Sequence, residues 1–301
     1  MIKCLHDIWA VARYELLDSV RGKRFAVVLL IYTAGAMLAA NACISVLHRL
    51  ENQIMETLKL SPSSSPGAVT EAFMNSSTFR RMIIQLVHDK EVAMELLATP
   101  PLALIYASLA FGLTPIFIML STPTRIAHEM ACGSARFALV RVSRGAWCIG
   151  KFLGQALEII IPLLFSALGA WAIARFRVPD MADISVISAM VIYGGKVWVY
   201  CLAYIGLALG VSQVCKSVNH AVALGLILWT SMTVMYSASQ HFSGDGWRRA
   251  LDIVPILVPT GHRLDLWSSD PAKVLPAMIY IITLSLVYFS IGHLFFRKRN
   301  L

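Results

Sequence analysis

Long apolar stretches alternate with short polar ones along the whole chain. A helix that crosses a bilayer needs about 20 mostly apolar residues, and six stretches meet that need. Four of them carry no charge, one carries only Glu158 and one carries only Lys196. The pattern predicts an all-α polytopic membrane protein, one domain over 1–301, with transmembrane helices at 25–47, 101–121, 152–174, 185–211, 221–239 and 274–296.

The composition also indicates a membrane protein. Hydrophobic residues make up 57% of the chain and charged residues only 14%, whereas a soluble domain carries about 25% charged residues. The formal net charge of +9 suggests nucleic acid as a partner, but the Lys and Arg residues flank apolar stretches too long for a soluble core. We therefore expect the lipid bilayer as a partner, and no nucleic acid.

Basic residues are unequally divided between the two sides that six spans create. The side with both termini and the segments 122–151 and 212–220 has fourteen Lys and Arg residues and four acids. The other side has eleven Lys and Arg residues and twelve acids. Because Lys and Arg gather on the cytoplasmic side of membrane proteins, we expect both termini in the cytoplasm.

Three segments outside the spans have patterns of their own. In 1–24 an apolar stripe at helical spacing predicts an amphipathic interfacial helix, a short soluble helix being the alternative; the stripe consists of Leu5, Ile8, Trp9, Ala12 and Leu16. The outer segment 48–99 has a Ser- and Pro-rich break followed by an amphipathic pattern, so we expect a helical outer loop. In 240–273 a proline-bounded apolar run is too short to cross, which favours a re-entrant or interfacial segment.

Two short motifs resemble catalytic signatures but lack a required residue. The segment 145–151 has the spacing of a phosphate-binding loop, but Phe152 stands where the magnesium-binding Ser or Thr is needed. The segment 128–132 begins like a zinc-protease helix, but Cys132 stands in place of the second His. We expect no catalytic residue, metal site or bound cofactor in this chain, so nucleotide hydrolysis would belong to another polypeptide.

Glu158 and Lys196 are the charged residues inside the predicted spans. Charge in the membrane interior is unfavourable unless it is paired or hydrated. Two interpretations stay open. The side chains line a transport pathway, or they are structural, either as a mutual pair or with Glu158 extended toward the inner interface. Separately, Gly206 and Gly210 have the small-xxx-small spacing of closely packed helices.

The order of several loose motifs resembles the permease subunit of type-2 ATP-binding-cassette (ABC-2-like) exporters, over essentially the whole chain. An amphipathic helix precedes span one, and a large outer loop follows that span. The motifs after span two begin with Arg-Ile-Ala-His-Glu at 125–129 and Gly133, and continue with Val-Ser-Arg at 142–144 and Gly-Lys at 150–151. Val142 stands where the family often has Pro, and such departures leave the substrate open.

The resemblance implies that the transport of substrate and the hydrolysis of ATP belong to different subunits. Two permease subunits, as a homodimer or with a paralogue, would assemble in a bacterial cytoplasmic (inner) membrane with cytosolic ATPases that bind ATP and Mg2+. The N-terminal helix and the coupling loop 122–151 would contact the ATPase; the coupling residues are Arg13, Glu15, Arg21, Arg125, Glu129, Gly133, Arg141 and Arg144. The alternative is a membrane protein without an ATPase, either a structural subunit of an envelope complex or a secondary transporter.

Glu129 is the only acid in the coupling loop. Exposed ion pairs contribute only about 0–1 kcal/mol, whereas truncating one side of a desolvated interface pair costs about 2–5 kcal/mol. We therefore expect Glu129→Ala to leave the permease folded and inserted, but to weaken ATPase docking or uncouple hydrolysis from transport.

Overall fold

The computed structural model describes residues 2–58, 94–95, 99–178, 183–241 and 254–298. These residues are 92% helical and contain no strand. Six helical stretches are long and apolar enough to cross a membrane, namely Phe25–Val46, Pro101–Ala131, Arg144–Arg177, Ile184–Val214, Val218–Ser239 and Pro271–Arg297. The all-α polytopic fold is therefore confirmed.

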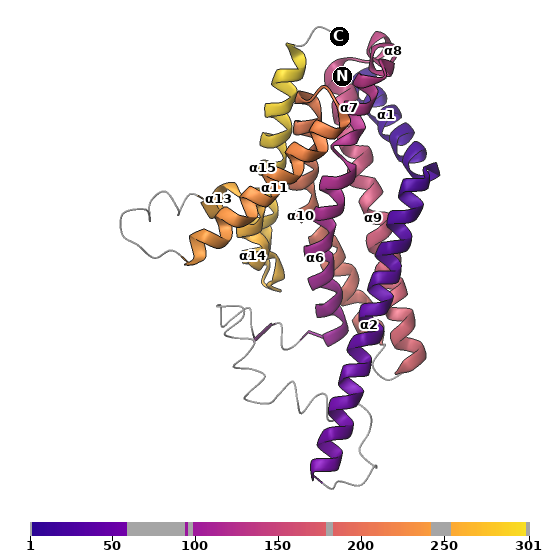
Figure 1. Ribbon diagram of the computed structural model, residues 1–301, viewed down its shortest axis with the longest axis vertical. Helices are drawn as coiled ribbons and strands as arrows, with labels where there is room; N and C mark the ends of the chain where they lie inside the picture. Colours follow the sequence, from indigo (N-terminus) through magenta and orange to yellow (C-terminus); the bar gives the residue numbers. More distant parts are fainter. Residues whose placement is uncertain (1, 59–93, 96–98, 179–182, 242–253, 299–301) are drawn as a thin grey trace.

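The long helices lie side by side, and both termini lie at the same end of the bundle (Figure 1). In chain order the main helices are α1 (Ile2–Arg21), α2 (Lys23–Leu58), α6 (Pro101–Ser121), α7 (Thr124–Ala131), α8 (Ser134–Arg141), α9 (Arg144–Arg177), α10 (Ile184–Val214), α11 (Val218–His241) and α15 (Pro271–Arg297). The short helices α7 and α8 lie at the end that holds the termini.

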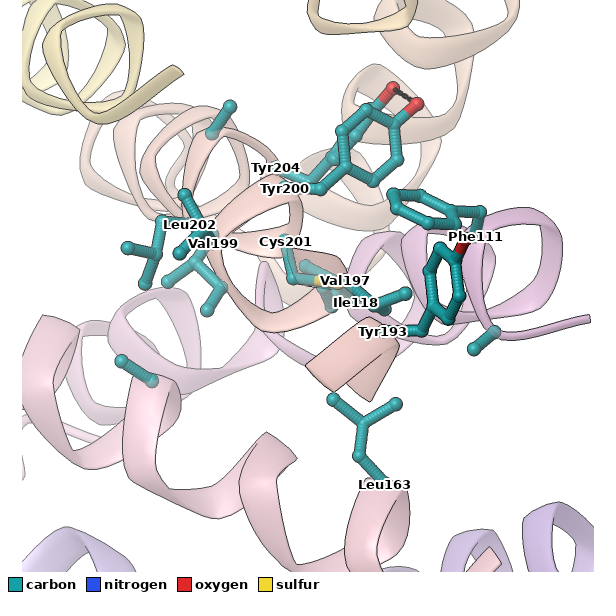
Figure 2. Packing of buried hydrophobic residues seen from close by; sticks show 14 of the residues in the cluster. Phe111, Ile118, Leu163, Tyr193, Val197, Val199, Tyr200, Cys201, Leu202 and Tyr204 are labelled. Atoms are coloured by element: carbon teal, nitrogen blue, oxygen red, sulfur yellow. Dashed lines mark hydrogen bonds between the residues drawn. The ribbon is translucent and has the colours of Figure 1, made fainter. Parts of the chain in front are cut away.

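Helix α10 forms the centre of the bundle. Its most apolar window is 89% buried, whereas the other five spans reach at most 50%. Figure 2 shows side chains of α10 on both sides of the helix, with Tyr200 and Tyr204 on one side and Val199 and Leu202 on the other. The ring of Tyr200 meets Phe111 of α6 edge to face at 5.3 Å. Packing on all sides explains why α10 is apolar all round.

Gly206 and Gly210 allow α10 to approach α15 closely. A Cβ atom at Gly210 would lie 2.6 Å from the carbonyl oxygen of Tyr288, and Ser285 of α15 donates a hydrogen bond of 2.6 Å to the carbonyl oxygen of Leu202. The close packing predicted from the glycine spacing is therefore confirmed, and it lies within one chain.

Helices α2 and α9 extend furthest beyond the spans predicted for them. Helix α2 continues to Leu58, because 48–58 contains no Gly or Pro and is rich in good helix formers. The remainder of the predicted outer helical loop, at 59–93, lies outside the described residues. Helix α9 begins at Arg144 rather than at 152, because the Ser143 hydroxyl accepts a hydrogen bond of 3.3 Å from the Ala146 N–H and caps the helix.

The coupling loop 122–151 is therefore mostly helical. It contains α7, α8 and the first two turns of α9. Gly133 lies between α7 and α8 with a φ of 77°, a left-handed conformation that residues with a Cβ rarely adopt. This turn separates two helices of eight residues each.

The described part of 240–273 packs on the bundle as short helices. Helix α13 (Val254–Leu257), a 3-10 turn (Pro259–His262) and α14 (Arg263–Trp267) follow one another, and Val254, Val258 and Leu266 are buried. In Figure 1, α13 and α14 lie beside α11 and α15, short of the far ends of α6 and α9. That this segment is re-entrant or lies at the membrane interface stays a prediction.

Candidate functional site

Helix α1 packs tightly against the first turns of α9. A Cβ atom at Gly150 would lie 2.6 Å from Cβ of Val11, and one at Gly154 would lie 2.8 Å from Cβ of Glu15. Ala12 of α1 is fully buried at this contact. Two glycines four residues apart thus let α1 lie directly on the backbone of a spanning helix.

Lys151 of α9 is the centre of an ion-pair network at this contact. Its side chain is only 3% exposed. Nζ lies 2.5 Å from Oε2 of Glu15 in α1 and 2.6 Å from Oε1 of Glu129 in α7. The ammonium group also lies 5.4 Å from the ring centroid of Trp147, a cation–π distance. A single buried cation therefore joins three helices.

Arg125 of α7 forms the second half of the network. Its Nη2 donates to Ser19 Oγ at 2.6 Å and to Glu158 Oε1 at 3.1 Å. Its Nε lies 3.7 Å from Oε1 of Glu15, close enough for an ion pair. Gln155, one turn before Glu158, donates a hydrogen bond of 2.6 Å to Oε2 of Glu158. Each charged side chain thus has at least one oppositely charged neighbour.

Three carboxylates share two cations in this network. Glu15 interacts with both Lys151 and Arg125, Glu129 with Lys151, and Glu158 with Arg125. Buried charges of this kind are stable only while each keeps its partners, because an unpaired charge in the interior is strongly unfavourable. A displacement of α7 therefore acts directly on α1 and α9, since moving α7 alone would separate buried charges.

Arg144 and Trp147 connect the start of α9 to the end of α15. The Arg144 guanidinium donates to the carbonyl oxygens of Phe296 at 3.3 Å and Arg297 at 3.0 Å. The Trp147 ring stacks on Phe296 with centroids 5.8 Å apart. A cation at the carbonyl end of a helix stabilises it through both hydrogen bonds and the helix dipole, so Arg144 holds the last turn of α15.

Lys196 lies in a separate cluster around Ser268, which follows α14. Its Nζ donates to the carbonyl oxygen of Ser268 at 2.8 Å and lies 4.9 Å from the ring centroid of Tyr193. On the other side of Ser268, the hydroxyl donates to Oε2 of Glu95 at 3.0 Å. The Ser269 N–H also donates to this Glu95 oxygen. The prediction of a mutual Glu158–Lys196 pair is therefore wrong, since Glu158 forms an ion pair with Arg125 and Lys196 donates to a backbone carbonyl.

Most of the chain matches a known protein family. The sequence profile of a family described as "ABC-2 family transporter protein" matches residues 9–247. That stretch holds α7, α8, α9 and the part of α1 from Trp9 onward, and so the whole ion-pair network. The chain belongs to the ABC-2 transporter family. Among curated proteins, no relative matches the sequence.

This ABC-2 permease is a multi-pass membrane protein with a role in transport. The segment 145–151, which has the glycine and lysine spacing of a phosphate-binding loop, lies inside helix α9. Phosphate binding by such a loop needs backbone amides that converge on the phosphate, and in a helix these amides point along the axis to carbonyls. Its Lys151 is bound to Glu15 and Glu129 instead.

Besides Gly133 at its turn and Arg144 at the end of α15, the predicted coupling residues of the permease fall into two groups. Glu15, Arg125 and Glu129 meet in the network, so they face the protein interior rather than a partner's surface. Arg13, Arg21 and Arg141 are exposed. Of the loop residues that we expect at the ATPase, Arg125 and Glu129 thus already have partners within the chain, Glu158 and Lys151.

Sequence reasoning missed Lys151 as a site residue. A signal was present: Lys151, Gln155 and Glu158 are spaced four and three residues apart, which places them on one face of an otherwise apolar helix. The predicted stripe on α1 is divided between two surfaces, and its place in the membrane interface stays a prediction. Ala12 packs on α9, but Leu5 and Trp9 are exposed, and the buried face of α1 instead includes Glu15 and Ser19.

Proposed function

We propose that this chain is the transmembrane permease subunit of an ABC exporter in a bacterial cytoplasmic membrane. Both termini lie in the cytoplasm, and a second permease copy or paralogue completes the assembly. A separate cytosolic ATPase binds ATP and Mg2+ and drives the movement of substrate. The proposal goes beyond family membership, and the ion-pair network is the observation that carries it.

The network supports coupling because it joins a short helix at the terminal end of the bundle to a spanning helix. Helix α7 contributes Arg125 and Glu129, and α9 contributes Lys151 and Glu158. A push on α7 would be transmitted to α9 through two ion pairs, and to α1 through Glu15. Coupling needs elements that move together between discrete arrangements, and buried ion pairs across helix contacts provide such a linkage.

Helix α8 supplies the surface that we assign to the ATPase. Phe137 and Val140 are 80% and 86% exposed, and they lie one turn apart between the exposed Arg136 and Arg141. Exposed apolar side chains with a charged rim are typical of protein interaction sites. In Figure 1, α8 projects from the end of the bundle that holds the termini.

The ATPase contact is tested by co-purification from membranes that contain both subunits. Phe137→Ser combined with Val140→Ser should abolish capture of the ATPase, while the permease still inserts and elutes as a single species. The matched control is Phe176→Ser, since Phe176 is equally exposed at 86% but lies at the far end of α9. Unchanged capture with the α8 variant, or a permease that transports without any ATPase, would favour the alternative of a secondary transporter or structural subunit.

The orientation is tested with the thiol of Cys132, which is exposed at the turn between α7 and α8. A hydrogen bond with the Ser134 hydroxyl lowers the pKa of this thiol, so its thiolate fraction at neutral pH is higher than usual and labelling is fast. A membrane-impermeant maleimide should label Cys132 in inside-out vesicles and leave it unlabelled in intact cells. Labelling in intact cells would reverse the proposed orientation.

A further inference from the structure

A cavity of about 860 Å³ lies between α2, α6 and α9, next to the end of α1. Its volume is in the upper part of the range of about 300–1,000 Å³ that is typical of small-molecule sites. Most of its wall is apolar, with Val28 and Phe25 from α2, Phe117 from α6 and Ile159 from α9. Such a wall suits a hydrocarbon chain.

One end of this cavity carries both signs of charge. Asp18 and Lys23 come from the junction of α1 and α2, Arg125 from α7, and Glu158 from α9. The contacts of Arg125 with other described residues use Nη2 and Nε, and a guanidinium has five N–H donors. Further donors on Arg125 and the exposed ammonium of Lys23 are therefore able to bind a phosphate.

The same end also has acceptors for an ammonium group. Asp18 is exposed at the mouth. Pro162, which lines the cavity with Glu158, lacks an N–H and cannot donate the helical hydrogen bond to the carbonyl oxygen of Glu158 four residues earlier. The Asp18 carboxylate thus lies in the region of Lys23 and Arg125. The backbone carbonyl of Glu158, which lacks its usual helical donor, lies in the same region.

The cavity opens sideways from the bundle. Val27 of α2 and Leu120 of α6 both line it, and they are 56% and 47% exposed. Both residues belong to candidate membrane spans, so in the inserted chain the opening lies within the thickness of the bilayer. A molecule that enters here comes from the lipid phase rather than from water.

We propose that this cavity binds one zwitterionic glycerophospholipid from the adjoining leaflet. An acyl chain lies along the apolar wall, the phosphate meets Lys23 and Arg125, and the headgroup ammonium meets Asp18 and the Glu158 carbonyl. A second copy of the chain is a less suitable occupant, since an apolar spanning helix would bring nothing to match charges of both signs. The proposal does not depend on an ATPase.

Photolabelling of the full-length chain tests this proposal. The chain is placed in vesicles of phosphatidylethanolamine that carries a diazirine on one acyl chain, and labelled peptides are located by mass spectrometry. Labelling should concentrate on the parts of α2, α6 and α9 that line the cavity. Equal labelling of all six spans would overturn the proposal.

Cavity-filling variants provide the matched comparison. Val28→Trp should lower labelling of the cavity by about tenfold, because the indole takes the space of the acyl chain, and Ile159→Trp should do the same from the opposite wall. Leu30→Trp is the control, since Leu30 is 68% exposed on the same helix and outside the cavity. If the control lowers labelling as much as Val28→Trp does, the site is refuted.

Three further experiments separate the possible occupants. Lys23→Gln should weaken labelling by the phospholipid but not by a photoactivatable hydrocarbon, whereas Lys3→Gln on the exposed face of α1 should change neither. Efficient disulfide cross-linking of two chains through Leu120→Cys, without lipid labelling, would assign the opening to a second copy and defeat the proposal. Addition of ATP and the ATPase distinguishes a resident lipid, which keeps its label, from an exported one, which loses it.

Discussion

Lys151 and Lys196, which are both buried, are held in contrasting ways. Lys151 contacts two carboxylates directly, from α1 and α7, within an ion-pair network that also includes Arg125 and Glu158. Among the described residues, Lys196 contacts no carboxylate directly. It and Glu95 bind Ser268 from opposite sides, through a carbonyl oxygen and a hydroxyl. The first arrangement joins three helices that meet near the termini, and the second anchors one short connection against the central helix.

We call the Lys151 network a linkage, because it makes the positions of three helices depend on one another. We call the Lys196 cluster an anchor, because it holds one segment in place. Direct charge pairs across helix contacts make the positions of α1, α7 and α9 depend on one another, because each displacement exposes an unpaired charge. A lysine bound to a neutral carbonyl restrains only its immediate neighbours. We therefore expect the Lys151 network to carry motion and the Lys196 cluster to hold α14 in place.

Replacing Lys151 gives the largest expected effect. Lys151→Met keeps the length of the side chain but leaves Glu15 and Glu129 without their cation, and breaking a buried pair in this way costs about 3–5 kcal/mol of unfolding free energy. Chemical unfolding of the purified permease measures the loss.

Two variants serve as controls for that result. Lys3→Met on the exposed face of α1 should change stability little. The double variant Lys151→Met with Glu15→Gln should lose less than the sum of the two single variants, because removing both charges relieves the unpaired one. Strict additivity of the two would show that Lys151 and Glu15 do not interact.

Replacing Lys196 should have a smaller effect. Lys196→Met removes one hydrogen bond from a charged donor to the Ser268 carbonyl, a contribution of about 1.5–3 kcal/mol. The same unfolding measurement applies, with the exposed Lys216→Met as control. Because Lys196 and Lys151 share no partner in the part of the chain that the structure describes, their double variant should be additive within about 0.3–0.5 kcal/mol. A loss as large as that of Lys151→Met would remove the distinction between linkage and anchor.

The close contact between α1 and α9 has the smallest expected effect. Gly150→Ala places a methyl group against Val11 and the Ile8 carbonyl oxygen, and such overpacking typically costs about 1–3 kcal/mol. The matched control is Gly145→Ala on the same helix. Apart from the adjoining backbone of α9 itself, no described atom lies within 4 Å of a Cβ at that position, so helix propensity alone should make the change neutral or stabilising. Equal effects of the two variants would show that α1 does not depend on the glycine contact.

The spans and the N-terminal helix were predictable because their signal is local. Twenty apolar residues in a row identify a membrane span wherever it packs, and the helical spacing of Leu5, Ile8 and Ala12 identified α1. The ends of the helices were less predictable. Helix α9 starts at Arg144 because of the Ser143 cap, and the count of apolar residues carried no sign of that start.

The partners of the charges could not be predicted, since they come from distant segments. Lys151 and Glu15 are 136 residues apart in the chain, and nothing local indicates that α1 lies across Gly150 and Gly154. Glu129 stood out as the lone acid of its loop, and hydropathy gave no means of matching it with Lys151. Conversely, Glu158 and Lys196 drew attention together only because both interrupt apolar stretches, yet each has its own partner.

The central claim is that ATP-driven motion reaches the spans through the network, and Glu129 tests it most directly. Glu129 is the most exposed of the three network carboxylates, so Glu129→Ala should leave the permease folded and bound to the ATPase. Hydrogen–deuterium exchange of the complex in nanodiscs, with and without ATP and vanadate, is the measurement. In the unaltered complex, trapping should change exchange at the ends of α6 and α9 far from the termini. We predict that Glu129→Ala abolishes this change while ATP hydrolysis continues; an unaltered change in that variant would contradict the account.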